Sequence, residues 1–346
     1  MEEGEYLDEE DEEDDDYPNI IAKWRTYARE PFAEFLGAFV LAVIGVGASA
    51  QAALSSDQNI QPTGTGAAST SVNLSAPLAW GAGVAMSVYI AGGISGGHIS
   101  PAITIVLAVF RGFPWKRVPS YIAGQLLGFT AGSGVAYGLY RHAISIYEGG
   151  PGIRTIGVGG TANFFATYPL EYVSNANAFF QEFTNVALLL ILVLAIGDAD
   201  NVPPPAGLNP IILMFMIMAI GLSLGLQSSY ALNPARDLGP RLVSWWAGYG
   251  TGVWNYRDQY WLWGPWAADI TGGLFGALLY DTLIFMGRES PMNKRWHVPF
   301  ISKTKKTEEM SRKWQGWKLH QKARRAGWRS RLVPEKEEPA EPKEVV

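Results

Sequence analysis

Two short stretches, SGGHISPAIT (Ser95–Thr104) and YALNPARDLGPRL (Tyr230–Leu242), decide the fold. Each contains a small polar residue followed by Pro-Ala, in the triplets Ser100-Pro101-Ala102 and Asn233-Pro234-Ala235. Serine or asparagine at the N-cap with proline in the first helical position is a strong helix start. The apolar runs that follow are too short to cross a membrane: Pro101–Phe110 and about Pro234–Ala247. The two motifs therefore predict a pair of half-helices.

Six longer apolar stretches surround these half-helices. A helix needs about 20 apolar residues to cross the roughly 30 Å hydrocarbon core of a membrane. Six stretches approach that length: Phe32–Leu54, Pro77–Ile94, Val118–Tyr140, Phe179–Ile196, Pro210–Gln227 and Trp263–Phe285. Only 17% of the 346 residues are charged, which is low for a soluble protein. We expect an all-α membrane protein with six transmembrane helices and two re-entrant half-helices.

The two halves of the chain follow one pattern. Glu34 lies inside the first span and Glu182 inside the fourth, and each half then contributes two more spans and one half-helix. A unit of three spans reverses its orientation when it is duplicated, because three is odd. This predicts an inverted repeat, at about 31–140 and 178–288, whose broken helices meet near the membrane midplane.

Charge is concentrated outside the apolar body. Twelve of the 32 acidic residues fall between Glu2 and Asp16, and such a run is typical of disorder. We expect an acidic disordered tail at 1–30, a membrane domain at 31–288 and a basic, then acidic, tail at 289–346. Positive residues near the span ends, such as Lys23, Arg111 and Arg288, favour cytoplasmic termini.

Two peripheral segments suggest modification and partners. The first outer loop, Ser55–Ala76, has no Lys or Arg and carries the sequon Asn73-Leu74-Ser75, a candidate glycosylation site. Tryptophans alternate with basic residues over Ser311–Arg331, which suits anionic lipid headgroups. A calmodulin-like partner and a solvated helix are equal alternatives. A contact between the acidic and basic tails, restricting the inner mouth, is a further hypothesis.

The residue inventory argues against several other classes of protein. The chain has no cysteine and four scattered histidines, so the sequence offers no disulfide framework, thiol nucleophile or zinc spacing. It contains no evident nucleophile–base set. We expect no enzyme activity, no cofactor, no metal and no nucleic-acid partner.

On the two motifs the chain resembles the aquaporin family, over about Pro31 to Met286, and Asp237 after Arg236 resembles its glycerol-conducting branch. The resemblance implies an aquaporin-like channel for water, glycerol and other small neutral solutes that excludes ions and protons. It also implies a homotetramer in the membrane, with one pore in each subunit; we place it in the plasma membrane.

The resemblance gives the two half-helix starts a role in selection. Each N-terminus carries roughly half a positive charge, which opposes cations in aquaporin-type pores. Asn233 is expected to donate its side-chain amide to the passing solute. Ser100 departs from the usual Asn, and we expect its oxygen to cap the helix while its proton faces the lumen, giving a slightly wider, less symmetric centre. That Ser100 only caps the helix stays an alternative.

By the same resemblance, four residues form the outer selectivity filter. Arg236 would hold polyol hydroxyls and oppose cations, Trp80 and Tyr230 would supply aromatic walls, and Gly221 would leave room for a polyol. Tyr230 stands where the family more often has Phe, so its hydroxyl could narrow or polarise the filter.

Three further positions resemble the glycerol branch: Asp237, Arg241 and Leu262. Asp237 could pair with Arg241 one helical turn on. Trp261, where that branch prefers Pro, weakens this signature.

Three polar residues are expected to support the pore loops. We expect Glu34 and Glu182 to accept hydrogen bonds from loop backbone that lipid cannot satisfy, with proton transfer as the alternative. His98 is expected to donate to a nearby backbone carbonyl, with pH sensing as the alternative.

Three other functions remain open from the sequence. A strict water channel is disfavoured by Gly221 and Asp237. A secondary transporter also uses inverted repeats and broken helices, and it would show saturation and ion dependence. A non-conducting relative that keeps the fold is the third.

Overall fold

The structure, a computed structural model, describes residues 19–294 except 56, 58–59, 61–68 and 158, and it leaves out the side chains of 69–73. Within that part the regular structure is helical and includes no β-strand. Six long helices make the body: α2 (Arg29–Leu54), α3 (Ser69–Ser95), α5 (Val118–Tyr147), α6 (Asn175–Gly197), α7 (Asn209–Leu224) and α10 (Asp269–Leu283).

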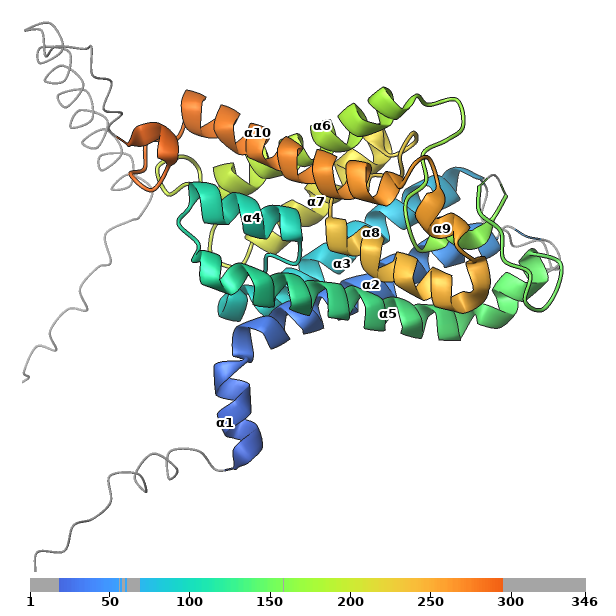
Figure 1. Cartoon of the computed structure of the whole chain (residues 1–346). Coiled ribbons are helices and arrows are strands. Elements are labelled where there is room, and N and C mark those ends of the chain that lie inside the picture. Colours follow the sequence, from blue (N-terminus) through green and yellow to red (C-terminus); the bar gives the residue numbers. More distant parts are fainter. Residues whose placement is uncertain (1–18, 56, 58–59, 61–68, 158, 295–346) are drawn as a thin grey trace, which may run out of the picture. The chain divides into compact units, whose positions relative to one another are not determined.

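Two short helices lie inside this body. They are α4 (Pro101–Phe110) and α8 (Pro234–Ser244), which follow one another between α5 and α10 in Figure 1. Both begin at an extended N-cap residue followed by proline. The prediction of two half-helices is therefore confirmed. The remaining pieces are α1 (Ile20–Tyr27), α9 (Gly252–Asn255), single turns at Trp115–Arg117, Thr161–Phe164 and Pro291–Asn293, and π-helical turns at Trp245–Tyr249 and Leu262–Ala268.

The structure corrects the predicted boundaries of several long helices. The second predicted span begins at Ser69 instead of Pro77, and the fifth ends at Leu224 instead of Gln227. The last predicted span, Trp263–Phe285, is regular only from Asp269, because Pro265 removes a backbone donor and the preceding residues Leu262–Ala268 form wider π-helical turns. The third span does not stop at Tyr140, since α5 continues to Tyr147.

Helix α1 covers Ile20–Tyr27 and α2 begins at Arg29, so part of the segment expected to be a disordered tail, 1–30, is helical in the structure. The side chain of Asn19 accepts a hydrogen bond from the Ala22 backbone N–H at 2.9 Å and starts α1. After Ala28, α2 begins at Arg29. The acidic run itself, residues 2–16, lies outside the described residues.

Glycines let the long helices touch backbone to backbone. A Cβ on Gly128 of α5 would clash with the Phe35 carbonyl of α2, and a Cβ on Gly272 of α10 would clash with the Phe183 carbonyl of α6. Small residues at such crossings are how membrane helices approach closely. The same kind of contact thus joins the first and last helix in each half of the chain.

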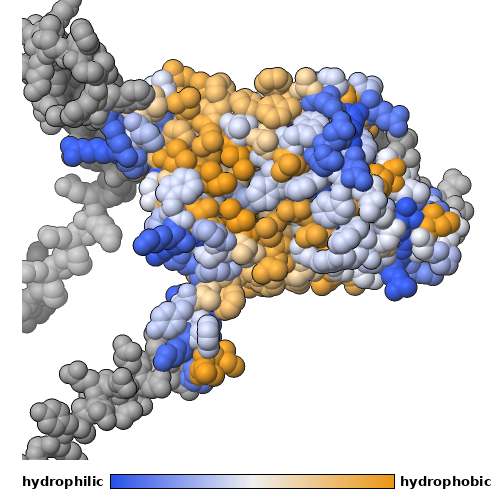
Figure 2. Space-filling model, in the orientation of Figure 1, coloured by the Kyte–Doolittle hydropathy of each residue, from blue (hydrophilic) through white to orange (hydrophobic). Residues whose placement is uncertain are grey.

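The surface fits a membrane. By length and composition, three described helices could cross one, Arg29–Leu54, Leu74–Ser95 and Asn175–Gly197, and α4 and α7 are shorter and apolar. Figure 2 shows a broad hydrophobic region across the middle of the visible face, with strongly hydrophilic residues toward its ends. This arrangement suits a protein whose middle surface faces lipid and whose ends face water.

Candidate pore

The two half-helices meet through Asn233. Its Nδ2 donates to the Ile99 carbonyl, next to the start of α4, at 2.7 Å. Its Oδ1 accepts from the N–H groups of Ala235 and Arg236, at 2.9 and 3.3 Å, and so caps α8. One side chain therefore closes the second half-helix and ties it to the first, and one amide N–H is left over.

Ser100 behaves differently at the start of α4. Its backbone is extended, with φ −145° and ψ 132°, but its hydroxyl makes no capping hydrogen bond. The prediction that this side chain caps the half-helix is wrong. The buried Oγ has no hydrogen-bond partner among the described residues, and Ser100 is one of the residues that line the central cavity.

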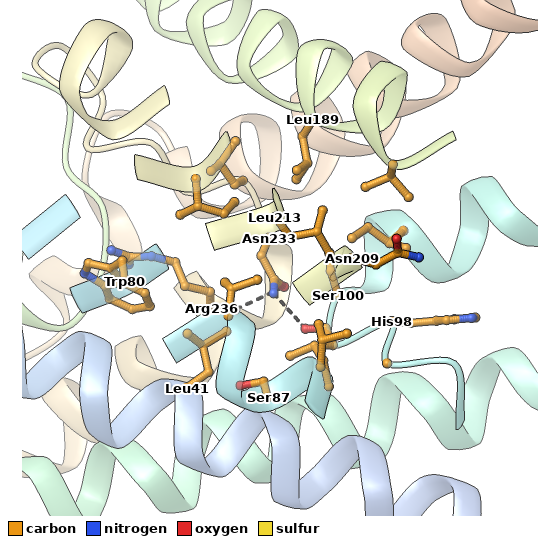
Figure 3. Close-up of a pocket in the computed structure, with 18 of the residues that line it drawn as sticks. Leu41, Trp80, Ser87, His98, Ser100, Leu189, Asn209, Leu213, Asn233 and Arg236 are labelled. Carbon is orange, nitrogen blue, oxygen red and sulfur yellow. Dashed lines mark hydrogen bonds between the residues drawn. The ribbon is translucent and has the colours of Figure 1, made fainter. Parts of the chain in front are cut away.

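A cavity of about 220 Å³ runs past both half-helix starts. This is room for several water molecules. In Figure 3, Trp80 and Arg236 lie at one end and Asn209 and His98 at the other, with Asn233 and Ser100 between them. Much of the wall is aliphatic, including Leu41, Leu189 and Leu213. A narrow, mostly apolar passage with a few polar groups is the result.

Arg236 and Trp80 contact one another and form the wall at their end of the cavity. The Arg236 guanidinium carbon lies 4.2 Å from the centre of the Trp80 ring, within the range of a cation–π contact. Nη1 of Arg236 donates to the Phe165 carbonyl at 3.3 Å. Trp80 is held by Ser49, whose Oγ accepts from the indole nitrogen at 3.2 Å, and by Gly45, where a Cβ would strike the ring.

Tyr230 joins this end of the cavity, but Gly221 is absent from the cavity wall. A Cβ on Gly221 would meet the Tyr230 ring at 3.1 Å, and one on Gly225 would meet it at 2.5 Å. Tyr230 therefore lies over these two glycines. The structure brings Trp80, Tyr230 and Arg236 together and places Gly221 behind the tyrosine, as the residue that makes space for its ring.

Asp237 and Arg241 form a fully buried ion pair, with Nε 2.8 Å from Oδ2. Arg241 also donates to the carbonyls of Val253 and Thr167, at 2.7 and 2.8 Å. Asp237 Oδ1 accepts from the N–H and hydroxyl of Thr167. The pair thus fastens the connections that contain Thr167 and Val253 to α8, and it does not line the cavity. Leu262, the third residue of that signature, is 53% exposed and lies outside the cavity lining.

Glu34 holds the first pore loop. Its carboxylate accepts from the backbone N–H groups of His98 and Ile99, at 2.9 and 2.6 Å. Ser95 Oγ donates at 2.5 Å and Gln125 Nε2 at 2.7 Å. Four donors surround this buried group, so backbone that could not reach water is satisfied.

Glu182 takes the corresponding place in the second half. It accepts from the N–H groups of Ala231 and Leu232, at 3.0 and 3.3 Å. Ser228 and Asp269 adjoin it. Both glutamates therefore hold the backbone that leads into a half-helix.

His98 contributes its backbone to this support, and its ring faces Thr104. Ring Nδ1 lies 3.2 Å from the Thr104 hydroxyl oxygen, and the ring packs on Phe113 and Tyr121 with centroids 4.7 and 5.0 Å apart. The expected hydrogen bond from the ring to a backbone carbonyl is not made. The Thr104 hydroxyl occupies that position.

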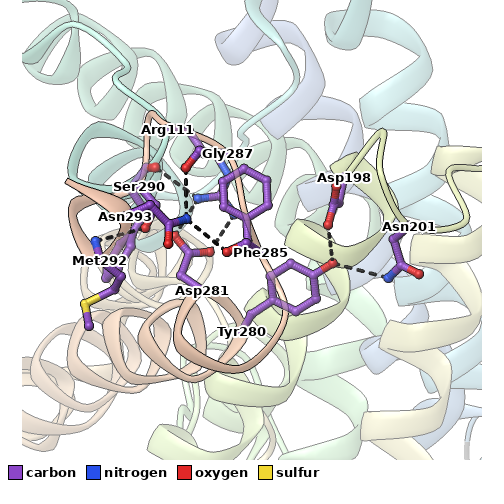
Figure 4. Close-up of polar contacts among 11 residues, drawn as sticks. Arg111, Asp198, Asn201, Tyr280, Asp281, Phe285, Gly287, Ser290, Met292 and Asn293 are labelled. Atoms are coloured by element: carbon purple, nitrogen blue, oxygen red, sulfur yellow. Dashed lines mark hydrogen bonds and ion pairs between the residues drawn. The ribbon is translucent and has the colours of Figure 1, made fainter. Parts of the chain in front are cut away.

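An ion pair links the C-terminal end of α4 to α10 (Figure 4). Arg111 makes two hydrogen bonds to the buried Asp281, at 2.8 and 2.7 Å. The guanidinium carbon of Arg111 lies 3.8 Å from the centre of the Phe285 ring. Asn293 Nδ2 donates to the carbonyls of Phe285 and Gly287, both at 2.9 Å. The chain that follows α10 is thereby fastened to the end of the first half-helix.

The loop after α5 is held by Glu148. This carboxylate accepts from the N–H and hydroxyl of Thr155 and of Thr161, at 2.5 to 3.1 Å. Partial burial raises the pKa of Glu148, but the hydrogen bonds from Thr155 and Thr161 outweigh it and leave the pKa below its ordinary value.

Some predicted features lie beyond the description. Asn73 falls within the backbone of α3, but its side chain is outside the described residues, as are Ser311–Arg331 and the acidic run. Within the described ranges, no group of three His, Asp or Glu residues could hold a metal ion.

Sequence reasoning missed two buried residues that adjoin the supporting glutamates, Gln125 beside Glu34 and Asp269 beside Glu182. A comparison of the two internal repeats that extended beyond the pore motifs would have found them. Each residue stands three positions before a close-packing glycine, Gly128 in α5 and Gly272 in α10.

Comparisons with known proteins agree with this architecture. The family model for the major intrinsic protein matches residues 21–280. Aquaporin-6 of Laccaria bicolor is 46% identical over 274 residues, covering 79% of this chain and 85% of that protein. The aquaglycerol porin AQY3 of Saccharomyces cerevisiae is 46% identical over 277 residues, covering 80% of this chain and 41% of that protein. The X-ray structure of the aquaglyceroporin from Plasmodium falciparum matches with a TM-score of 0.64 at 30% identity, over 75% of this chain and 97% of that one. The chain belongs to the major intrinsic protein family.

Proposed function

We propose that this chain is a membrane channel for water and small uncharged solutes, chiefly glycerol, and that it excludes ions and protons. The observation that carries the proposal is the Arg236 guanidinium lying against Trp80 at one end of an apolar cavity that passes Asn233. The names of the relatives above, an aquaglycerol porin and an aquaglyceroporin, support glycerol as a solute.

The cavity suits a molecule with one polar and one apolar side. Arg236 offers N–H donors, and the rings of Trp80 and Tyr230 offer apolar faces. A polyol can turn its hydroxyls to the first and its CH groups to the second. A cation would lose hydration beside a buried positive charge and the N-termini of two half-helices, which is unfavourable.

The remaining features of the proposal follow from the sequence and the family. The channel domain spans 31–288, the assembly is a homotetramer with one pore in each subunit, and both termini are cytoplasmic in the plasma membrane. Asn233 and Ser100 contact the solute at the centre. The filter consists of Trp80, Tyr230 and Arg236, with Gly221 behind them. The signature of the glycerol-conducting branch consists of Asp237, Arg241 and Leu262. Glu34, Glu182 and His98 support the loops, and Asn73 is a glycosylation site.

Stopped-flow light scattering on vesicles that hold the purified protein tests the proposal. In a glycerol gradient the vesicles should shrink and then reswell fast. In a sorbitol gradient the reswelling should be slower, and in a salt gradient the vesicles should shrink without reswelling. Flux should rise linearly with the gradient. If reswelling in glycerol is no faster than in empty vesicles, the protein would be a strict water channel. Saturating, ion-dependent flux would indicate a transporter.

Arg236→Ala should increase proton and cation leak across the same vesicles, because it removes the buried positive charge that faces the cavity. Arg141→Ala is the matched control, since Arg141 is exposed on α5 and absent from the cavity lining. Equal leak in the two variants would contradict the role of Arg236.

A further inference from the structure

The two pore loops correspond residue by residue. Aligning the helix starts pairs Ser95 with Ser228, His98 with Ala231 and Ile99 with Leu232. In both loops the last two of these backbone N–H groups donate to a buried glutamate, Glu34 or Glu182. Residues that correspond in the sequence alignment therefore also make the same hydrogen bonds in the structure.

In the first repeat the glutamate also receives a side-chain donor from α5. Gly128 packs against the carbonyl of Phe35, the residue after Glu34. One turn earlier on α5, Gln125 Nε2 donates to Glu34 at 2.7 Å. Gln125 is fully buried, and this amide also donates to the Thr104 hydroxyl at 3.0 Å.

In the second repeat the same position is an acid. Gly272 packs against the carbonyl of Phe183, the residue after Glu182. Asp269 stands three residues before Gly272, just as Gln125 stands three residues before Gly128. Asp269 is fully buried and stands one turn from the contact between Gly272 and Phe183, beside Glu182. A carboxyl group thus occupies the place of an amide donor.

Neither oxygen of Asp269 has a hydrogen-bond partner among the described residues, although buried polar atoms are nearly always paired. The other ionisable groups that face it are Arg236 and Asp237 from α8 and Tyr260 from the segment before α10. Arg241 is engaged by Asp237. Two buried carboxylates in contact repel strongly, and a proton shared between them removes that repulsion.

The buried charges around Asp269 also call for one proton. Fully ionised, two positive side chains would face three negative ones: Arg236 and Arg241 against Asp237, Glu182 and Asp269. One proton on the acid pair brings this set to neutrality, and an uncompensated charge at this depth is costly.

We propose that Asp269 and Glu182 form a buried acid pair that binds one proton, with the protonated carboxyl of Asp269 donating to Glu182 as the Gln125 amide donates to Glu34. A carboxylic acid kept neutral in an apolar site can serve as a hydrogen-bond donor. Asp269 is thereby a positioning residue: it fixes Glu182, which holds the backbone of Ala231 and Leu232 just before Asn233.

Infrared spectroscopy of the purified full-length protein tests this without any transport assay, so the result does not depend on the proposed channel activity. At neutral pH, the difference spectrum between the wild-type protein and Asp269→Asn should show the loss of one C=O stretching band of a protonated carboxyl. Asp258→Asn, at an exposed aspartate, should show no such loss. An unchanged band in Asp269→Asn would overturn the proposal, and so would evidence of an ionised Asp269 held by a water molecule.

Two further variants keep the test decisive. Asp269→Asn should fold and unfold at nearly the wild-type temperature, since the amide supplies the same donor, whereas Asp269→Ala should unfold at a lower temperature. Failure of Asp269→Asn to fold would count against the proposal. Gln125→Glu rebuilds the acid pair in the first repeat and should add a second protonated-carboxyl band; an unaltered spectrum in that variant would contradict the equivalence of the two sites.

Discussion

A single residue breaks the symmetry of the pore centre. Asn233 uses its amide to cap α8 and to bond the Ile99 carbonyl, whereas the Ser100 hydroxyl has no hydrogen-bond partner within the described part of the chain. The first half-helix therefore starts with an uncommitted hydroxyl that a passing solute can bond. The second starts with a donor already fixed in direction.

Ser100→Asn should restore symmetry and narrow the centre. The new amide would lie opposite the Leu232 carbonyl, the equivalent of Ile99, and one added hydrogen bond is worth about 1 kcal/mol. We expect higher thermal stability and a lower ratio of glycerol to water permeability, by less than about tenfold. Stopped-flow measurements in vesicles give the ratio.

Ser120→Asn, at an exposed serine on α5, is the control for this comparison. A ratio that is equal in the two variants would mean that the side chain at position 100 does not contact the solute.

At the scale of the helix, glycine contacts set the distances on which the pore depends. α10 touches α6 at Gly272, where any Cβ would clash with the Phe183 carbonyl. This contact lies one residue from Glu182 on α6 and three from Asp269 on α10. A change of spacing here would therefore separate the two acids and loosen the loop that they support.

Gly272→Ala should lower the stability of the protein by about 1–3 kcal/mol, because the added methyl group forces α6 and α10 apart. Gly134→Ala is the matched control: it is also a helical glycine, but nothing lies within 4 Å of its Cβ position. The control should be neutral or slightly stabilising, by up to about 1 kcal/mol. Thermal unfolding in detergent compares them, and equal midpoints would refute the close contact.

Sequence patterns predicted the elements that local chemistry encodes. Asn233 followed by proline marks the start of α8, and the i+4 spacing of Asp237 and Arg241 anticipates their ion pair. The π-helical turns before α10 had no local signal beyond Pro265.

The rest of the site depends on tertiary packing, which local patterns do not report. Gly221 was predicted as an open wall, but the Tyr230 ring fills the space over it. Asp269 was missed because its role exists only opposite Glu182, on another helix. Comparison of the two repeats would have paired Asp269 with Gln125, and the family resemblance alone did not.

At the scale of the whole molecule, the start of the C-terminal tail is fixed near one end of the pore. Asn293 bonds the chain just after α10, and the ion pair between Arg111 and Asp281 joins α10 to α4. The chain that continues from residue 295 lies outside the description, but its origin is beside the first half-helix. The hypothesis that the basic tail contacts the acidic N-terminal run therefore needs a functional test.

Deletion of residues 1–16 tests whether such a contact restricts the channel. If the acidic run draws the basic tail toward the inner mouth, the deletion should raise glycerol flux per channel, and high salt should raise the wild-type flux in the same way, because exposed charges more than about 10 Å apart are screened at 0.1 M. A variant of full length with its twelve acidic residues between Glu2 and Asp16 changed to Asn or Gln separates charge from chain length. It should match the deletion. Flux per channel that is identical in all three proteins, at equal reconstituted amounts, would show that the tails leave the pore unrestricted.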